Sequence, residues 1–235
     1  MLTDGYHDWK AIGLIDKSIV GKAIMTREEQ KLNRELKKRL PQEIRKLNKK
    51  YKLQYAHGFL YRFEGDFLYI GIPLMSSIEC GRLSISVEIK PLVLDEIYWR
   101  VQQMNMEVLL RQPKSFHVRG VFTVRRIYFD KLSVYQVTSD NFAEMIENML
   151  IDFDRFISEH KKNLINIECI KDNLEGYEIS DLTKALVYIN QEEYEAALFL
   201  LQNGDKNDGI IHMDSRGKTA KEYAIDFCLD AMKKR

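Results

Sequence analysis

Runs of aromatic and branched apolar residues around a turn, followed by a segment in which apolar and polar residues alternate, predict three adjacent β-strands in the first half of the chain. Residues 59–63 and 67–72 are rich in aromatic and branched side chains and flank Glu64-Gly65-Asp66, a connection typical of a β-hairpin. From Leu83 to Ile89 every second residue is apolar, and Ser84, Ser86, Glu88 and Lys90 fill the other positions. A period of two predicts a half-buried strand with one side in water.

Residues 116–137 also have strand character. Short apolar runs at 116–124, 127–129 and 133–137 predict further strands, and Asp130-Lys131 is expected to turn the chain between the last two. Residues 1–25 have apolar residues interrupted by glycine and fit either a short helix or a strand.

Helical spacing appears on both sides of these strands. Thr26 to Glu29 form a capping box that predicts a helix to about Arg39, and Pro41 either kinks this helix or begins a second one. Residues 92–104 are also helical in pattern, and Ser139 or Asp140 is expected to cap the longest amphipathic helix. Its apolar face is wide enough to cover a sheet and comprises Phe142, Met145, Ile146, Met149, Leu150, Phe153, Phe156 and Ile157.

These elements predict an α+β fold with a mainly antiparallel sheet covered by helices. We expect this domain to span residues 1–163, because the segments after it contain only short helical pieces with polar breaks. Residues 164–235 then form an all-helical C-terminal part.

Three segments of this C-terminal part, residues 181–186, 192–205 and 214–224, resemble a pair of ankyrin repeats over about residues 181–230. Leu200-Leu201-Gln202-Asn203-Gly204-Asp205 is similar to the end of a second repeat helix with its glycine turn. The spacing from Thr183 to Thr219 is 36 residues against the usual 33, and Thr-Ala-Lys-Glu replaces the usual Thr-Pro-Leu-His. A plain helical hairpin is the alternative.

The resemblance implies protein binding without chemistry, and two repeats would have to pack on the first domain to bury a core. The residues expected to contact a protein partner are Glu192, Glu193, Asp205, Asp208, Asp214 and Arg216.

Composition indicates an ordinary globular protein, with 45% hydrophobic residues and a net charge of +1. We expect neither a membrane span nor a secretory signal, and the scattered Cys80, Cys169 and Cys228 suggest reduced thiols in the cytoplasm. Charge is nevertheless uneven: residues 27–52 hold eleven Lys or Arg against four Glu, and residues 140–200 hold fourteen acids against five bases. Such a dipole can steer a charged partner, or both can be solvated helix faces.

One pair of residues in the sequence, Glu88 and Lys90, is a candidate for a catalytic site. The five histidines lack metal-ligand spacing, and no phosphate loop or nucleophile elbow occurs, so we expect no resident metal or cofactor. Glu88-Ile89-Lys90 resembles the Glu-x-Lys element of PD-(D/E)xK nucleases. That resemblance implies that Asp66 and Glu88 hold a divalent metal while Lys90 positions the attacking water, and that the basic helix meets phosphates.

The hairpin Tyr61-Arg62-Phe63-Glu64-Gly65-Asp66-Phe67-Leu68-Tyr69-Ile70 is similar to one in bacterial domains of unknown function that are associated with polymorphic toxins. We therefore expect a non-enzymatic protein-binding module, an immunity-type inhibitor whose acidic C-terminal surface would mask a basic toxin. The metal-dependent nuclease and a scaffold module without a toxin partner are the alternatives. A nucleic-acid partner is not expected, and the oligomeric state is open.

Overall fold

A five-stranded antiparallel sheet forms the centre of the fold, as the alternating pattern predicts. The computed structural model describes residues 25–119, 123–124, 126–162, 167–171, 179–204 and 217–235. The strands lie side by side in the order in which they occur in the chain. They are β1 (Gln54–Ala56), β2 (Phe59–Glu64), β3 (Phe67–Met75), β4 (Arg82–Pro91) and β5 (Ile127–Gln136). With the helices around it, this sheet confirms the α+β class.

The β2–β3 hairpin forms where it is expected. Glu64 lies opposite Phe67, and Gly65 has a φ of 56°, a left-handed conformation that glycine adopts without a steric penalty. The short strand β1 was not foreseen, because three residues are too few to show a periodic pattern.

The expectations for residues 116–137 are partly wrong. Residues 116–119 form a short helix, α4 (Phe116–Arg119), and β5 runs straight through Asp130-Lys131 without a turn. These two residues pair with Val87 and Ser86 at a place where the β4–β5 register shifts twice. A bulged register tolerates polar residues inside a strand, so a local Asp-Lys pair did not mark a chain reversal.

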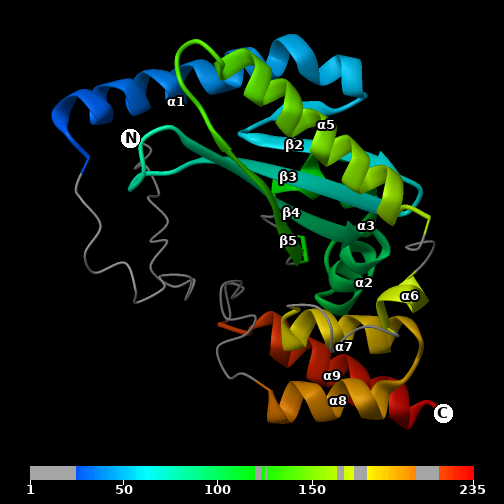
Figure 1. The fold of residues 1–235 in the computed structure, drawn as a ribbon. Helices are drawn as coiled ribbons and strands as arrows, with labels where there is room; N and C mark the ends of the chain where they lie inside the picture. Colours follow the sequence, from blue (N-terminus) through cyan, green and yellow to red (C-terminus); the bar gives the residue numbers. More distant parts are fainter. Residues whose placement is uncertain (1–24, 120–122, 125, 163–166, 172–178, 205–216) are drawn as a thin grey trace.

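Two long helices cover one face of the sheet (Figure 1). Helix α1 (Arg27–Leu47) starts with the predicted capping box and passes through Pro41 as one helix, continuing into the 3₁₀ turn η3 (Asn48–Tyr51). Helix α5 (Phe142–His160) lies beside it. The buried residues Leu36, Leu40 and Ile44 of α1 belong to the same core as the apolar face of α5.

The start of α5 differs from the prediction. Neither Ser139 nor Asp140 caps it; Asn141 is the N-cap residue and makes no side-chain capping bond. The Asn141 side chain instead accepts a hydrogen bond from the Thr138 amide at 2.7 Å. The Asn141 side-chain oxygen could have capped the helix, but it is used instead in a local turn with Thr138.

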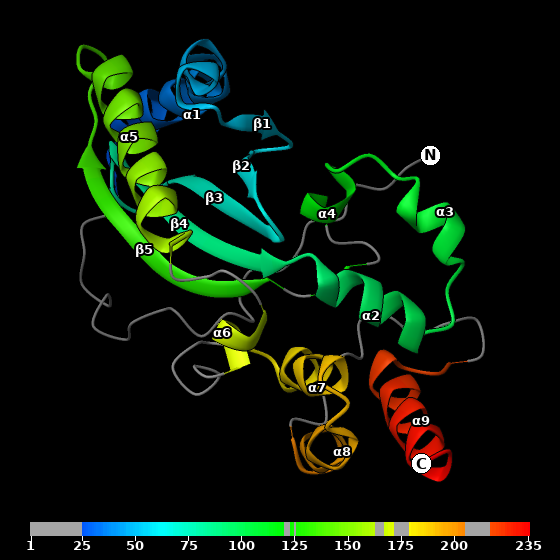
Figure 2. The ribbon, with the colours of Figure 1, turned by 90° about the vertical axis from the view of Figure 1, so that its right-hand side faces the viewer.

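The remaining helices lie beyond the other face and the end of the sheet (Figure 2). Helix α2 (Val93–Val101) follows β4, and α3 (Met106–Leu110) and α4 follow it. Val118 of α4 packs with Tyr61, Leu68 and Ile70 in a second, smaller core. Further along are α6 (Ile167–Lys171), α7 (Asp181–Asn190), α8 (Tyr194–Asn203) and α9 (Ala220–Lys233).

Helix α2 connects the sheet to the C-terminal helices. It contacts β4 on one side and both α7 and α9 on the other, and residues from all of these elements belong to one continuous core. The C-terminal part is thus packed on the first part through α2, whatever its family. Within the described ranges, no helix has the length and apolar character needed to cross a membrane.

A test of the packing between sheet and helix is the Gly71→Ala variant. A Cβ atom at Gly71 would lie 2.7 Å from Ile85 Cδ1 and 3.1 Å from Phe153 Cε1, so the substitution should cost about 1–3 kcal/mol of unfolding free energy by overpacking. Urea denaturation measures this loss. The double variant Gly71→Ala/Ile85→Val removes the nearest methyl group and should recover part of it; equal stability of wild type and Gly71→Ala would contradict the described packing.

Candidate functional site

Three charged or titratable side chains meet between the end of β4, the first turn of α2 and helix α4. The Lys90 ammonium lies 2.8 Å from Asp95 Oδ2 and donates to the His117 carbonyl, also at 2.8 Å. His117 Nδ1 is 2.6 Å from the same Asp95 oxygen, and the Val124 amide donates to Asp95 Oδ1 at 2.8 Å. Asp95 is completely buried and Lys90 is 1% exposed, so this cluster lies inside the protein.

The chain positions each member by an ordinary local rule. Lys90 is the penultimate residue of β4, and Pro91 ends that strand before α2 begins at Val93. Asp95 lies in the first turn of α2, where the helix dipole favours a carboxylate. The His117 ring lies against Trp99, one turn further along α2, with ring centroids 5.6 Å apart. An ion pair without solvent therefore joins strand and helix, and the imidazole holds α4 against both.

Burial and charge act on Lys90 in opposite directions. Removal from water lowers the pKa of Lys90, while the neighbouring Asp95 carboxylate raises it, and burial is the stronger effect. A lysine in this position is held by its acceptors and has little exposed surface. Positioning an attacking water, the role that the nuclease resemblance assigns to Lys90, would require it to leave these acceptors.

The structure separates the other two residues of the nuclease alternative. Glu88 forms an ion pair with Arg126 at 2.8 Å, and Ile70 lies opposite it on β3. Asp66 is exposed at the β2–β3 turn, four residues from Ile70, which is about 13 Å along an extended strand. Two ligands of one divalent ion each lie about 2.0–2.6 Å from it. Within the described residues, no group of three His, Cys, Asp or Glu side chains could hold a metal ion.

The expected solvent-facing side of β4 is partly wrong. Ser84 and Lys90 are buried, while Ser86 and Glu88 are half-buried. Helix α4 lies over this end of the sheet, with Val118 packed against Leu68 and Ile70, an arrangement that alternation within one strand cannot reveal. The sequence reasoning thereby missed Asp95, His117 and Arg126, the partners of Lys90 and Glu88. The sequence contained one signal for the Lys90–Asp95 pair. Asp95 lies in the first turn of a predicted helix, five residues after Lys90 near the end of a strand.

Two of the six residues expected to bind a partner lie in the described part of the chain. Glu192, with a φ of 60°, is in the tight turn between α7 and α8, and Glu193 immediately precedes α8. Each has a basic neighbour within the chain: Glu192 lies 2.7 Å from Arg235 Nη2, and Glu193 pairs with Lys171. Asp205, Asp208, Asp214 and Arg216 lie outside the described residues, as do residues 1–24.

A groove of about 590 Å³ lies between the C-terminal end of α2 and helix α9. Its apolar lining residues are Val101, Phe227, Leu229 and Ala231. Its basic lining residues are Arg100, Lys218, Lys233 and Lys234, and its acidic ones are Asp226 and Asp230. Leu229 is 39% exposed, so part of its apolar side chain is accessible within the groove. The groove thus combines apolar surface with a charged, predominantly basic rim.

The acidic excess of residues 140–200 is partly neutralised within the fold. Glu147 of α5 lies 2.5 Å from Lys50, and its other contact is the Tyr51 hydroxyl at 2.7 Å. Asp154 of α5 pairs with Arg62 of β2 at 2.5 Å. The pairing lowers the pKa of Glu147, chiefly through the hydrogen bond from Lys50. Acidic and basic stretches that are far apart in the sequence are therefore neighbours in the fold.

Comparison with known proteins identifies no relative of this chain. No family model, no curated protein sequence and no solved structure matches it. The geometry described above is therefore the basis for any functional assignment.

The Lys90–Asp95 pair should be essential for stability. Replacing Lys90 with Met leaves the Asp95 carboxylate buried without its cation, which typically costs about 3–5 kcal/mol. Urea denaturation should show this loss, and the double variant Lys90→Met/Asp95→Asn should be more stable than Lys90→Met alone. Lys46→Met, which breaks an exposed pair with Glu43, is the matched control and should cost less than about 1 kcal/mol.

Calorimetric titration with Mg²⁺ and Mn²⁺ tests the nuclease alternative directly. Because Glu88 and Lys90 are bound to other groups of the chain, we expect no saturable heat from wild type or from Glu88→Ala. Saturable binding by wild type that is lost in Glu88→Ala would overturn this expectation and favour the nuclease reading.

Proposed function

We propose that this protein is a non-enzymatic protein-binding module, of the kind that acts as a bacterial immunity-type inhibitor. Its partner would bind at the groove between α2 and α9, next to the C-terminal helices whose sequence resembles ankyrin repeats. The groove is the observation that carries the proposal.

The composition of the groove fits a protein ligand. Protein interfaces combine an apolar centre with a polar rim, and their most important contacts fill pockets with large side chains. Phe227 and Leu229 supply the apolar surface here, and the basic and acidic residues of α9 lie around them. The groove also lies where two parts of the fold meet, a common position for binding sites.

The charged clusters support binding more than catalysis. Asp95 binds both Lys90 and His117, and Glu88 binds Arg126, so these charged groups stabilise the fold. No hydroxyl or thiol group donates to the His117 ring in the part of the chain that the structure describes. Among the described residues, the Asp–His pair has no hydrogen-bonded nucleophile of the kind that a hydrolytic triad uses.

The charges of the α7–α8 turn and of the groove bear on the charge of the partner. A basic toxin would meet Glu192 and Glu193 at the α7–α8 turn, but Arg235 and Lys171 already contact these two carboxylates. The groove itself has more basic than acidic lining residues. A partner that carries both apolar and acidic groups therefore fits the groove.

A matched pair of variants tests this proposal in the cells that encode the protein. Leu229→Arg places a charge in the groove, whereas Phe199→Arg makes the same kind of change at a 67% exposed residue of α8 that does not line it. In quantitative affinity purification, a partner should be recovered with wild type and Phe199→Arg and reduced at least about tenfold with Leu229→Arg, because a charge buried at an interface costs 2 kcal/mol or more.

Circular dichroism and thermal unfolding should show that both variants are folded. Equal recovery of the partner by all three proteins would contradict a role for the groove. Recovery of no specific partner by wild type would contradict the proposed function itself.

A further inference from the structure

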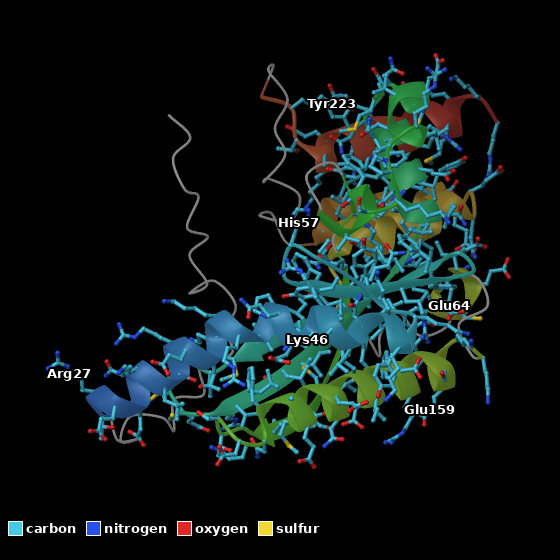
Figure 3. All side chains as sticks on the ribbon, turned by 90° about the horizontal axis from the view of Figure 1, so that it is seen from above. Arg27, Lys46, His57, Glu64, Glu159 and Tyr223 are labelled. Carbon is cyan, nitrogen blue, oxygen red and sulfur yellow. The ribbon has the colours of Figure 1, made fainter. Side chains whose placement is uncertain are left out.

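The solvent-facing side of helix α1 carries a basic stripe, which we define as Arg27, Lys31, Arg34, Lys38 and Arg45. At 3.6 residues per turn, these five residues fall within an arc of about 60°, and the stripe is about 27 Å long. All five are exposed. The stripe lies opposite Leu36, and the buried side of α1 includes Leu36, Leu40 and Ile44. Figure 3 shows Arg27 at the free end of this helix, with Lys46 further along it.

The stripe is largely free of internal neutralisation. Among the described residues, no carboxylate forms an ion pair with any of its five cations, whereas Lys46 and Lys50 on the same segment pair with Glu43 and Glu147. Glu29 lies near the start of the stripe, but its carboxylate is bound to Thr26 in the capping box. Glu28 and Glu35 flank the stripe, at about 80–100° from Arg27 and about 40–60° from Lys31 on the helical wheel, without an ion pair to a stripe residue among the described residues.

The chemistry of the stripe distinguishes among polyanionic partners. A membrane-binding helix inserts its apolar face, but the apolar face of α1 is buried against the sheet and α5. A protein partner usually needs an apolar centre, and none of the large exposed hydrophobic residues of the described chain lies on α1. A row of cations without apolar neighbours suits a phosphate backbone, where contacts are electrostatic and independent of sequence.

We propose that the basic stripe of α1 binds the phosphate backbone of a double-stranded nucleic acid. A duplex fits better than a single strand, because single-strand sites interleave cations with aromatic side chains for base stacking. The stripe has one aromatic neighbour, Tyr55, whose ring lies 5.5 Å from Arg45 Cζ. Its length matches about eight base pairs at 3.4 Å per step.

The net charge of the whole chain conceals this feature. A total of +1 led us to expect no nucleic-acid partner, but binding depends on the local field and not on the sum. The fold places acidic residues of α5 beside the far end of α1 and η3, and leaves the stripe facing solvent. The proposal is independent of the α2–α9 groove.

Fluorescence anisotropy with a labelled DNA duplex of about 20 base pairs tests the proposal, because such a duplex is longer than the stripe. Five phosphate contacts predict a slope of log K against log salt of about −4 to −5, so the affinity should fall by two to three orders of magnitude between about 50 and 200 mM salt. In the stripe variant Lys31→Gln/Arg34→Gln/Lys38→Gln the slope should shrink to about −2.

The control variant Lys46→Gln/Arg155→Gln/Lys162→Gln removes the same total charge from exposed residues outside the stripe and should keep the wild-type slope. Unfolding temperature and circular dichroism verify that both variants are folded. Three outcomes would overturn the proposal: no saturable binding of duplex by wild type at low salt, an equal loss in both variants, or binding to vesicles with 30% phosphatidylserine but not to duplex.

Discussion

The ion pair between Lys90 and Asp95 is the contact on which the rest of the structure depends. Neither side chain has appreciable contact with solvent; Lys90 also donates to the His117 carbonyl of α4, and Asp95 accepts from the Val124 amide between α4 and β5. The pair fixes α2 at the end of β4, with Trp99 of the same helix completely buried. Because α7 and α9 pack on α2, the position of the whole C-terminal part follows from this one attachment.

This attachment also explains why the functional candidates lie where they do. The α2–α9 groove lies at the C-terminal end of α2, where Arg100 and Val101 of the helix and Gln103 just after it line the groove. The stabilising ion pair and the groove therefore lie at opposite ends of α2, a helix of nine residues. The chemistry suggested by Glu88 and Lys90 is, in the described structure, a set of internal contacts.

Much of the first part of the fold could be predicted from periodicity. Runs of aromatic and branched residues around a turn located β2 and β3, alternation located β4, and the helical spacing of Phe142 to Ile157 located α5. Contacts between distant segments were not predictable in this way. The sequence around Lys90 does not indicate that Lys90 will contact His117. The polar pair Asp130-Lys131 has the composition of a turn, and only its irregular pairing with β4 shows that it lies within a strand.

The candidate site shows the same limit. Glu88 and Lys90 could be selected from the sequence because they share one side of a strand, but Asp95 and Arg126, which define their environment, come from other elements. The charge asymmetry was visible in the composition, whereas its partial neutralisation by α5 depends on the packing of two helices about a hundred residues apart. Residues that lie outside the described ranges, such as Asp205 and Asp208, keep their predicted role as predictions.

Helix α2, held by the Lys90–Asp95 pair, couples the sheet to the C-terminal helices. Hydrogen–deuterium exchange of wild type and Asp95→Asn tests this coupling most directly, because exchange reports local opening in each element separately. We expect Asp95→Asn to lose protection together in α2, α7 and α9, while α1, α5 and the central strands remain protected. A loss of protection confined to α4, with α2, α7 and α9 unchanged, would contradict the coupling.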